Sequence, residues 1–344
     1  MQACGELEGD GRERPPARLA VRVVLAPDKL RGTYTAAEAA AALAAGWRRV
    51  RPDDELVSVP LADGGEGTAE ALLRARGGRW QEADAHDALG RPIRARFALL
   101  PDGEAALDVA EACGLARVSD RPRDPLGASS RGAGELLAAA VACGAERVVI
   151  GVGGTATSDG GVGLRDGLGP LPSGVELVAA LDVTNPLLGP EGAAAVFGPQ
   201  KGASPEQVQE LERRLAALRL PTAELPGAGA GGGIGAMLLA LGARAVPGAE
   251  LVIAETGLER QLTAAALCIT AEGAIDAGTL RGKVAGTVAE ICRGAGVPLV
   301  AVAGAAEEGA AAALAAMGAR VHVDGDLRRA GAVLAARVER HAPG

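Results

Sequence analysis

One glycine-rich segment, residues 61–68 (L-A-D-G-G-E-G-T), constrains the fold of this chain more than any other feature. An alternating apolar run at 55–60 predicts a short strand before it, and good helix formers at 69–76 predict a helix after it. Asp63 and Glu66 therefore fall on a strand-to-helix turn, whose glycines let the backbone adopt positive φ and approach a ligand. Two carboxylates at the end of a strand suit a hydrated Mg²⁺ ion or a substrate hydroxyl. Alone, the segment is explained equally well as a polar loop whose acids cap the next helix.

The start of the chain repeats the same strand–loop–helix unit. Residues 21–26 (V-R-V-V-L-A) predict a strand, a loop follows at 27–32, and Thr35 with Glu38 predicts a capping box at the start of an alanine-rich helix. Two such units in succession predict a parallel sheet, which binds ligands outside the carboxyl ends of its strands. Five side chains should then share one rim of this sheet: Asp28, Lys29, Arg31, Asp63 and Glu66.

The pattern changes after Gly77 and returns near Leu267. Short alternating runs at 79–107 predict antiparallel hairpins, whereas 267–270, 298–303 and 320–323 predict further strands that alternate with helices. We therefore predict an α/β fold in which a Rossmann-like parallel sheet domain is interrupted by a second α/β domain with antiparallel elements. The expected parts are a disordered N-terminal extension at 1–19, a discontinuous domain at 20–77 and 265–344, and an inserted domain at 78–264.

A second glycine-rich loop, residues 151–163 (G-V-G-G-T-A-T-S-D-G-G-V-G), follows a predicted buried strand at 146–151. Its successive backbone N–H groups and hydroxyls can cradle phosphate oxygens, and Asp159 could hold an associated metal. The loop has neither the G-K-[ST] of a Walker A loop nor the G-x-G-x-x-G of a dinucleotide site, and a tight structural turn is the alternative. The residues assigned to nucleotide binding are Gly153, Gly154, Thr155, Thr157, Ser158, Gly160 and Lys201.

Two more predicted strands end in polar residues. Asp182 follows the strand at 177–181, with Asn185 close behind it. Glu272 and Asp276 follow the strand at 267–270, and Lys283 opens the next helix, where N–H groups and the helix dipole favour an anion. The pair of carboxylates at a strand end is thus repeated along the chain.

Composition narrows the class of protein. The 344 residues are 48% hydrophobic but contain no apolar run of membrane-spanning length, and the polar N-terminus lacks the apolar core of a secretory signal. A net charge of −8 disfavours nucleic acid and anionic membranes as partners, and five widely spread cysteines fit reduced thiols in a cytoplasmic protein. Only three of the 35 basic residues are lysines, and all three lie in loops already singled out: Lys29, Lys201 and Lys283.

Seven motifs in order resemble the bacterial glycerate kinases that phosphorylate D-glycerate with ATP. They are P-D-K-L-R-G, P-L-A-D-G-G-E-G-T, G-V-G-G-T-A-T-S-D-G-G, D-V-T-N-P-L-L-G-P, F-G-P-Q-K-G-A, P-G-A-G-A-G-G-G-I-G, and A-E-G-A-I-D with R-G-K. The resemblance covers about residues 21–304 and implies an ATP- and Mg²⁺-dependent transfer that yields 2-phosphoglycerate in a cleft between two domains. Such chemistry asks for positioning and charge neutralisation, which suits glycine loops, acids and lysines.

The resemblance also suggests roles for the residues at the strand ends. We assign catalysis to Asp182 as the base that deprotonates the acceptor hydroxyl, to Lys283 as the cation facing the transferring phosphoryl group, and to Asp63. The residues assigned to the acceptor are Asp28, Lys29, Arg31, Asn185 and Arg131. The residues assigned to the metal are Asp63, Glu66, Asp159, Glu272 and Asp276.

The chain departs from the family pattern at several of these positions. The family usually has Ser at Lys29, Lys at Arg31 and Asn at Ser158, and it has Gly, Arg and Gln at three positions that are here Ala271, Ala274 and Gly278. The lost arginine could grip a carboxylate or phosphate in bidentate fashion. Two alternatives therefore stay open, a kinase of another small hydroxy acid and a non-catalytic nucleotide- or metabolite-binding relative. The sequence also leaves open which hydroxyl is phosphorylated and whether the protein is a homodimer.

Overall fold

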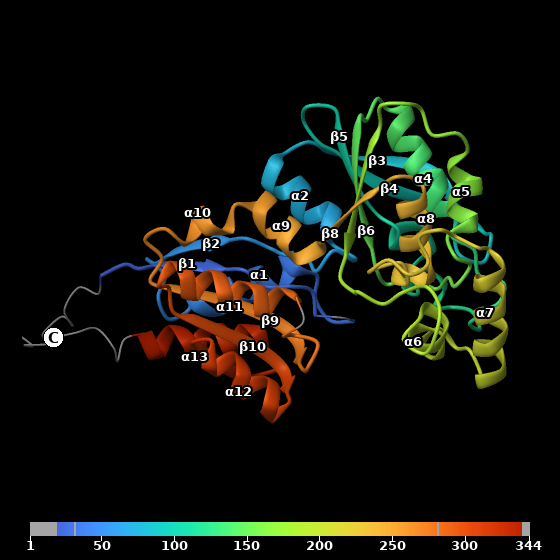
Figure 1. Cartoon of the computed structure of the whole chain (residues 1–344). Coiled ribbons are helices and arrows are strands. Elements are labelled where there is room, and N and C mark those ends of the chain that lie inside the picture. The colour runs from blue at the N-terminus through green and yellow to red at the C-terminus, as the bar shows by residue number, and fades with distance from the viewer. Residues whose placement is uncertain (1–18, 31, 281, 339–344) are drawn as a thin grey trace, which may run out of the picture.

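The structure, a computed structural model, describes residues 19–30, 32–280 and 282–338 (Figure 1). Arg31 and nearly all of the predicted N-terminal extension lie outside the described residues. The described chain forms two sheets, one of five strands and one of six. The predicted fold class, a parallel sheet interrupted by a second α/β unit with antiparallel elements, is confirmed.

The five-stranded sheet is parallel throughout and has the order β11-β10-β9-β1-β2. Counted along the chain this is the doubly wound order 2-1-3-4-5, whose switch point lies between β1 and β9. Its strands are β1 (Arg22–Leu25), β2 (Glu55–Ser58), β9 (Leu267–Ile275), β10 (Leu299–Ala306) and β11 (Ala319–Val323). The expected strand at 267–270 thus extends to Ile275, because it continues to pair with β10 from Ala303 to Ala306.

Both faces of this sheet are covered by helices. In β1, Val23 and Leu25 face a core with α1 and α13, while Val24 faces the opposite core together with Ala26, the residue after the strand, as expected for a parallel strand buried on two sides. One face packs against α1 (Ala36–Arg48) and α13 (Leu327–Val338). The other packs against α2 (Thr68–Arg76), α9 (Gly248–Thr256), α10 (Leu258–Leu262), α11 (Val284–Ala295) and α12 (Glu308–Ala316).

The six-stranded sheet has the order β3-β4-β5-β6-β7-β8, antiparallel from β3 to β5 and parallel from β5 to β8. Its strands are β3 (Arg79–His86), β4 (Pro92–Leu99), β5 (Glu104–Asp108), β6 (Arg147–Val152), β7 (Glu176–Leu181) and β8 (Arg244–Pro247). One face carries α4 (Arg131–Ala142), α5 (Val162–Leu168) and α8 (Ile234–Ala240). The shorter or peripheral elements are α3 (Ala110–Cys113), η1 (Ala116–Val118), α6 (Ala193–Phe197), η2 (Pro199–Lys201), α7 (Pro205–Ala217) and η3 (Ala230–Gly232).

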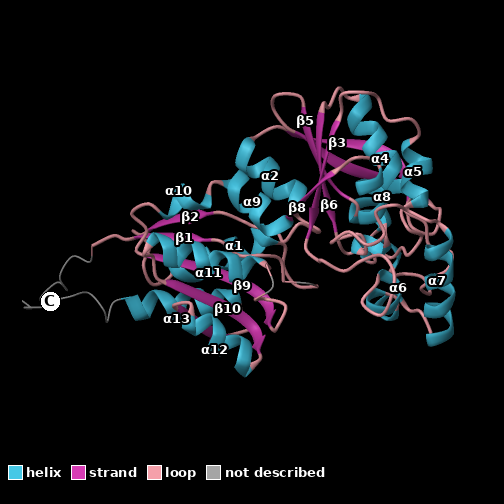
Figure 2. Cartoon of the chain, in the orientation of Figure 1, coloured by secondary structure: helices cyan, strands magenta, loops and turns pink. Residues whose placement is uncertain are grey.

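Helices α2 and α9 lie between the two sheets (Figures 1 and 2). Leu72 of α2 and Val252 of α9 belong to one buried cluster with Cys268 of the first sheet and with Val149 and Val178 of the second. The two sheets therefore share a continuous apolar core through these helices. We propose 20–77 with 265–344, and 78–264, as the two domains, with the boundary running through this shared layer. Within the described residues, no helix has the length and apolar character needed to cross a bilayer.

Candidate active site

The switch point between β1 and β9 brings the first acidic residues together. The Asp28 N–H donates to the Ala271 carbonyl oxygen at 2.9 Å, which ties the loop after β1 to β9. Asp28 and Glu272 are both buried. Burial raises the pKa of the Asp28 carboxyl, and the neighbouring Asp63 carboxylate raises it further. Carboxylates from three strand ends therefore share one region, as the parallel sheet predicted.

Lys29 lies at the centre of these acids. Its Nζ is 2.9 Å from Asp63 Oδ1 and donates to the Glu66 carbonyl oxygen at 3.0 Å. Burial alone would lower the pKa of Lys29, but the Asp63 and Asp28 carboxylates outweigh that effect and raise it above its usual value. The sequence analysis assigned Lys29 to binding of the acceptor. In the structure its ammonium binds the Asp63–Glu66 turn.

Four residues at the end of β9 and in the segment that follows it form a smaller polar group, made of two contacting pairs. Thr279 Oγ1 donates to Glu272 Oε2 at 2.9 Å, and burial raises the pKa of the Glu272 carboxyl. Lys283 is the N-cap residue of α11, with its Nζ 3.6 Å from Asp276 Oδ1. The predicted placement of Lys283 at the start of a helix agrees with the structure, and its half-exposed ammonium leaves it accessible to an anion.

The two glycine-rich loops lie directly against each other. The Val152 N–H donates to the Gly64 carbonyl oxygen at 2.8 Å. A Cβ atom on Gly153 would lie 2.9 Å from Gly65 Cα, and one on Gly154, at φ +66°, would lie 2.5 Å from Glu66 Oε1. Only glycine permits this approach, so part of the glycine content predicted to cradle a ligand serves to join the two loops.

Lys201 supports the second loop from inside the protein. It is 4% exposed, and its Nζ donates to the Thr157 carbonyl oxygen at 2.5 Å and to Thr155 Oγ1 at 3.2 Å. Burial lowers the pKa of Lys201 to about 8. Ser158 Oγ is also buried and finds no hydrogen-bond partner within the described part of the chain. A loop that carries both a buried ammonium and an unpaired buried hydroxyl is an environment that favours an anionic oxygen.

Asp159, which the sequence analysis proposed as a metal donor, accepts several hydrogen bonds from the protein itself. Its Oδ2 accepts hydrogen bonds from the Ser130 N–H and Oγ, both at 2.8 Å, and from the Gly163 N–H at 3.2 Å, while Oδ1 accepts from the Gly161 N–H. The carboxylate therefore joins the starts of α4 and α5. Arg131, at the start of α4, turns to Glu135 at 2.9 Å. We leave Asp159 and Arg131 out of the candidate site for this reason.

Asp182 directly follows β7 and adjoins the Asp63 turn. A Cβ atom on Gly64 would lie 3.3 Å from the carbonyl carbon of Ala180, two residues before Asp182. Asn185 donates from Nδ2 to the Glu191 carbonyl oxygen at 2.7 Å and so shapes the loop after β7. The carboxyl end of β7 is thus brought next to the turn that contains Asp63.

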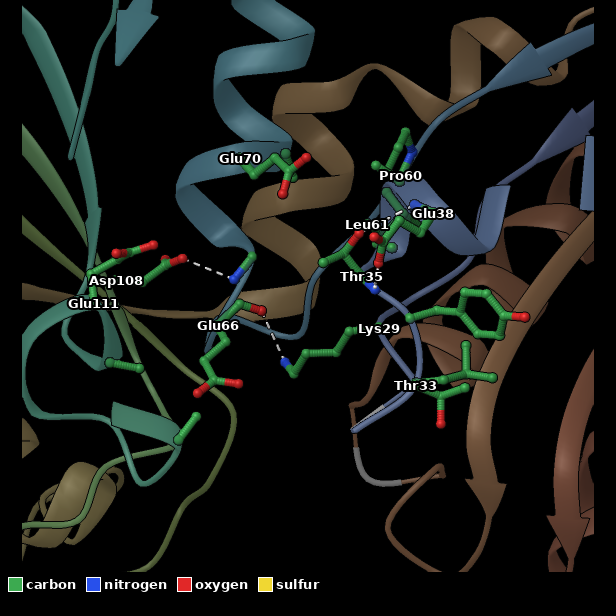
Figure 3. A pocket seen from close by; sticks show the side chains of 18 of the residues that line it. Lys29, Thr33, Thr35, Glu38, Pro60, Leu61, Glu66, Glu70, Asp108 and Glu111 are labelled. Atoms are coloured by element: carbon green, nitrogen blue, oxygen red, sulfur yellow. Dashed lines mark hydrogen bonds between the residues drawn. The ribbon is translucent and has the colours of Figure 1, made fainter. Parts of the chain in front are cut away.

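A cleft of about 540 Å³ opens beside this region, on the side of α1 and α2 (Figure 3). Lys29, Glu66 and Asp108 line it together with the segment before α1 and residues of β3, β4 and η1. Its volume is in the usual range for a small-molecule site. Trp80 and Arg96 form part of one wall, with the Arg96 guanidinium 4.2 Å from the ring centroid, and Glu111 links Arg96 to Arg117.

Asp108 is a cleft residue that the sequence analysis missed. It is the last residue of β5, and its carboxylate accepts the N–H groups of Gly67 at 2.8 Å and Ala69 at 3.1 Å, at the start of α2. Burial raises the pKa of the Asp108 carboxyl to about 7. An acid at the end of a strand is a usable signal, but the alternating runs at 79–107 predict antiparallel hairpins, whereas β5 pairs in parallel with β6 on its other side.

The architecture and this cluster of strand-end acids, lysines and glycine loops are those of a known family of small-molecule kinases. Residues 23–172 and 166–330 match the glycerate kinase family, and the chain belongs to it. The protein is therefore a kinase.

Named relatives agree with this placement. A glycerate 2-kinase of Escherichia coli K12 is 38% identical over 324 residues, which cover 83% of this chain and 85% of the relative. A glycerate kinase of Bacillus subtilis 168 is 37% identical over 83% of this chain and 85% of its own length. The crystal structure of a protein of Salmonella typhimurium LT2, provisionally named glycerate kinase 2, has a TM-score of 0.74 at 34% identity and covers 94% of this chain and 99% of that one.

Proposed function

We propose that the protein catalyses the ATP-dependent phosphorylation of D-glycerate, with 2-phospho-D-glycerate as the product. The family supports transfer from ATP to glycerate. The choice of the 2-hydroxyl is our own proposal, and it follows the name of the Escherichia coli relative. The reaction takes place where the carboxyl ends of β1, β2, β7 and β9 meet the loop after β6.

The observation that carries this proposal is the support of the second glycine-rich loop by Lys201. Its buried ammonium holds Thr155 and Thr157, and the next residue of the same loop, Ser158, has a buried hydroxyl without a hydrogen-bond partner among the described residues. Together they supply positive charge and a donor for the phosphate oxygens of the nucleotide. A metabolite-binding site without phosphate would gain little from a buried, weakly compensated ammonium, since burying a charge is costly.

Mg²⁺ fits this site as a companion of the nucleotide rather than as a resident ion. Among the described residues, no group of three or more His, Cys, Asp and Glu side chains is arranged to hold a metal. Mg²⁺ commonly takes only one or two protein carboxylates and completes its shell with phosphate oxygens and water. Glu66, Glu272 and Asp276 are the proposed donors, since the Oδ1 of Asp63 already accepts Lys29. The ion would neutralise charge on the phosphates.

Two residues act on the reacting groups in this proposal. Asp182, at the end of β7, accepts the proton of the acceptor hydroxyl, and Asn185 orients the acceptor nearby. Lys283, at the start of α11, faces the phosphoryl group in transit, where its ammonium adds to the field of the helix N-terminus. Asp63 holds the turn between these groups through Lys29 and the Gly65 N–H.

The decisive experiment is product identification after incubation with ATP, Mg²⁺ and D-glycerate. Proton-coupled phosphorus NMR distinguishes the isomers, because the phosphorus couples to one proton in the 2-phosphate and to two in the 3-phosphate. We expect a doublet, and a triplet would contradict the proposed site of transfer. L-Glycerate and other small hydroxy acids serve as controls in a coupled assay of ADP release. Faster turnover of another hydroxy acid than of D-glycerate would assign the protein to the alternative substrate.

A further inference from the structure

The ammonium of Lys29 occupies the position among the carboxylates where a cation is most needed. Asp28, Asp63, Glu66 and Glu272, named here the carboxylate group, come from the loops or ends of three adjacent strands. Lys29 Nζ contacts Asp63 Oδ1 at 2.9 Å, and the Asp63 and Lys29 side chains are 6% and 15% exposed. The pair is thus an internal ion pair, which depends on mutual contact far more than a surface pair does.

Lys29 also binds the main chain of the turn. It donates to the Glu66 carbonyl oxygen at 3.0 Å (Figure 3), and the charge of the Glu66 carboxylate also helps to raise the pKa of Lys29. A Cβ atom on Gly65 would lie 3.7 Å from Nζ and 3.4 Å from Gly153 Cα. The ammonium is therefore enclosed by the turn that packs on the second glycine-rich loop, and it links the loop after β1 to both.

A divalent cation would compete with Lys29 for the same oxygen. Asp63 Oδ1 already accepts Lys29 Nζ and the Gly65 N–H, at 2.9 and 3.2 Å. A metal there must come within about 2.1 Å of that oxygen and would lie close to the ammonium. The repulsion between the two charges is large at such a separation in a buried site.

We propose that Lys29 is a positioning residue that acts as a built-in cation for the carboxylate group. It fixes the Asp63–Glu66 turn and keeps a divalent metal from binding to Asp63 in the absence of nucleotide. The metal enters with the nucleotide and uses the remaining donors. This last step rests on the proposed function, whereas the exclusion of metal from the free protein does not.

The test is a titration of the full-length, nucleotide-free protein with Mn²⁺. Binding is measured as the decrease of the free Mn²⁺ signal in electron paramagnetic resonance. We expect K29S to bind one Mn²⁺ per chain at least about tenfold more tightly than the wild type, because a unit charge next to the metal is removed. K29R should behave like the wild type, since it keeps the charge. The double variant K29S/D63N should lose the gained site.

Wild-type protein that binds one Mn²⁺ tightly without nucleotide, in a manner abolished by D63N, would overturn the proposal. A folded K29S variant with no gain in Mn²⁺ affinity would overturn it as well. Circular dichroism and thermal unfolding show whether K29S is folded, and K29M, which keeps most of the aliphatic chain, replaces it if it is not. None of these measurements needs turnover. A protein that shows the expected Mn²⁺ pattern but fails to phosphorylate glycerate would refute the proposed function and leave this inference intact.

Discussion

Replacement of Lys201 by methionine separates the support of the nucleotide loop from the stability of the fold. Methionine is similar in length and apolar, so it fills the same buried space without the charge. The ammonium now donates to the Thr157 carbonyl oxygen at 2.5 Å and to Thr155 Oγ1 at 3.2 Å. The variant loses both contacts and leaves the carbonyl oxygen without its charged donor.

The effects on stability nearly cancel. Burial lowers the pKa of Lys201 from its usual 10.5 to about 8, which corresponds to a cost of about 3 kcal/mol for keeping the ammonium charged in the folded state. Loss of a hydrogen bond from a charged donor costs about 1.5–3 kcal/mol. We therefore expect the free energy of unfolding of K201M at pH 7 to lie within about 1.5 kcal/mol of the wild type, the difference of these opposing effects.

The lowered pKa of Lys201 also predicts how the stability of the wild type relative to K201M changes with pH. Between about pH 8 and 10.5 the unfolded chain holds a proton at Lys201 that the folded chain has released. Wild-type stability should therefore rise relative to K201M as the pH increases through that range. Below pH 8 both states of the wild type are protonated, and the difference between the two proteins should stay constant.

The kinetics of K201M should change far more than its stability does. Without the ammonium, the loop at 151–163 loses its anchor and positive charge, and we expect the KM for ATP to rise roughly 10- to 100-fold, the scale of one charged hydrogen bond. A coupled assay of ADP release with varied ATP measures it. T155V is the matched control, because it removes the weaker contact and keeps the charge, so its KM should change far less. A stable K201M with an unchanged KM for ATP would refute the role of Lys201.

Three other substitutions test separate parts of the structure. D182N should fold and bind ATP but lose most of its kcat, because the amide cannot accept the hydroxyl proton; near-normal turnover would exclude Asp182 as the base. K283A should lower kcat by roughly 100-fold, the scale of one electrostatic contact in the transition state, with partial recovery in K283R, and full activity of K283A would end the assignment. Arg329 holds the pKa of Asp324 at about 2 through hydrogen bonds of 2.6 and 2.9 Å. D324N should therefore cost about 1 kcal/mol in urea unfolding at pH 7. The difference should shrink as the pH falls from about 4 to 2, because the unfolded chain takes up a proton at Asp324 in that range while the folded chain still holds the carboxylate ionised; a constant difference would contradict this ion pair.

Features governed by neighbouring residues could be predicted from the sequence. The predicted capping box of Thr35 with Glu38 is present, since it involves a side chain and a backbone group three residues apart. The strands before the acidic turns are also found, because apolar alternation and glycine-rich breaks are local signals. The rim of strand-end acids then follows from the parallel order of the sheet.

Features that depend on distant partners could not be predicted. Asp108 caps α2 across about 40 residues of sequence, and nothing near it indicates that contact. Asp159 looked like a metal ligand, yet its oxygens bind backbone groups at two helix starts. The close approach of Gly153 to Gly65 likewise arises only when β6 and the Asp63 turn are packed together. A glycine in a loop signals close approach, but not whether a ligand or another loop is the neighbour.

The position of β1 between β2 and β9 has a consequence for synthesis of the protein. Val23 pairs with Leu56 on one side and with Leu267 on the other, whereas all six strands of the second sheet are complete once Pro247 has been made. Strand β1, an interior strand of the first sheet, therefore lacks its second neighbour until late in translation, and contacts this distant in sequence form slowly. We expect the second sheet to fold first on the ribosome, while β1 presents an unpaired apolar edge of the kind that invites aggregation. Nascent chains that stop before β9 should accordingly be the species that most need a chaperone.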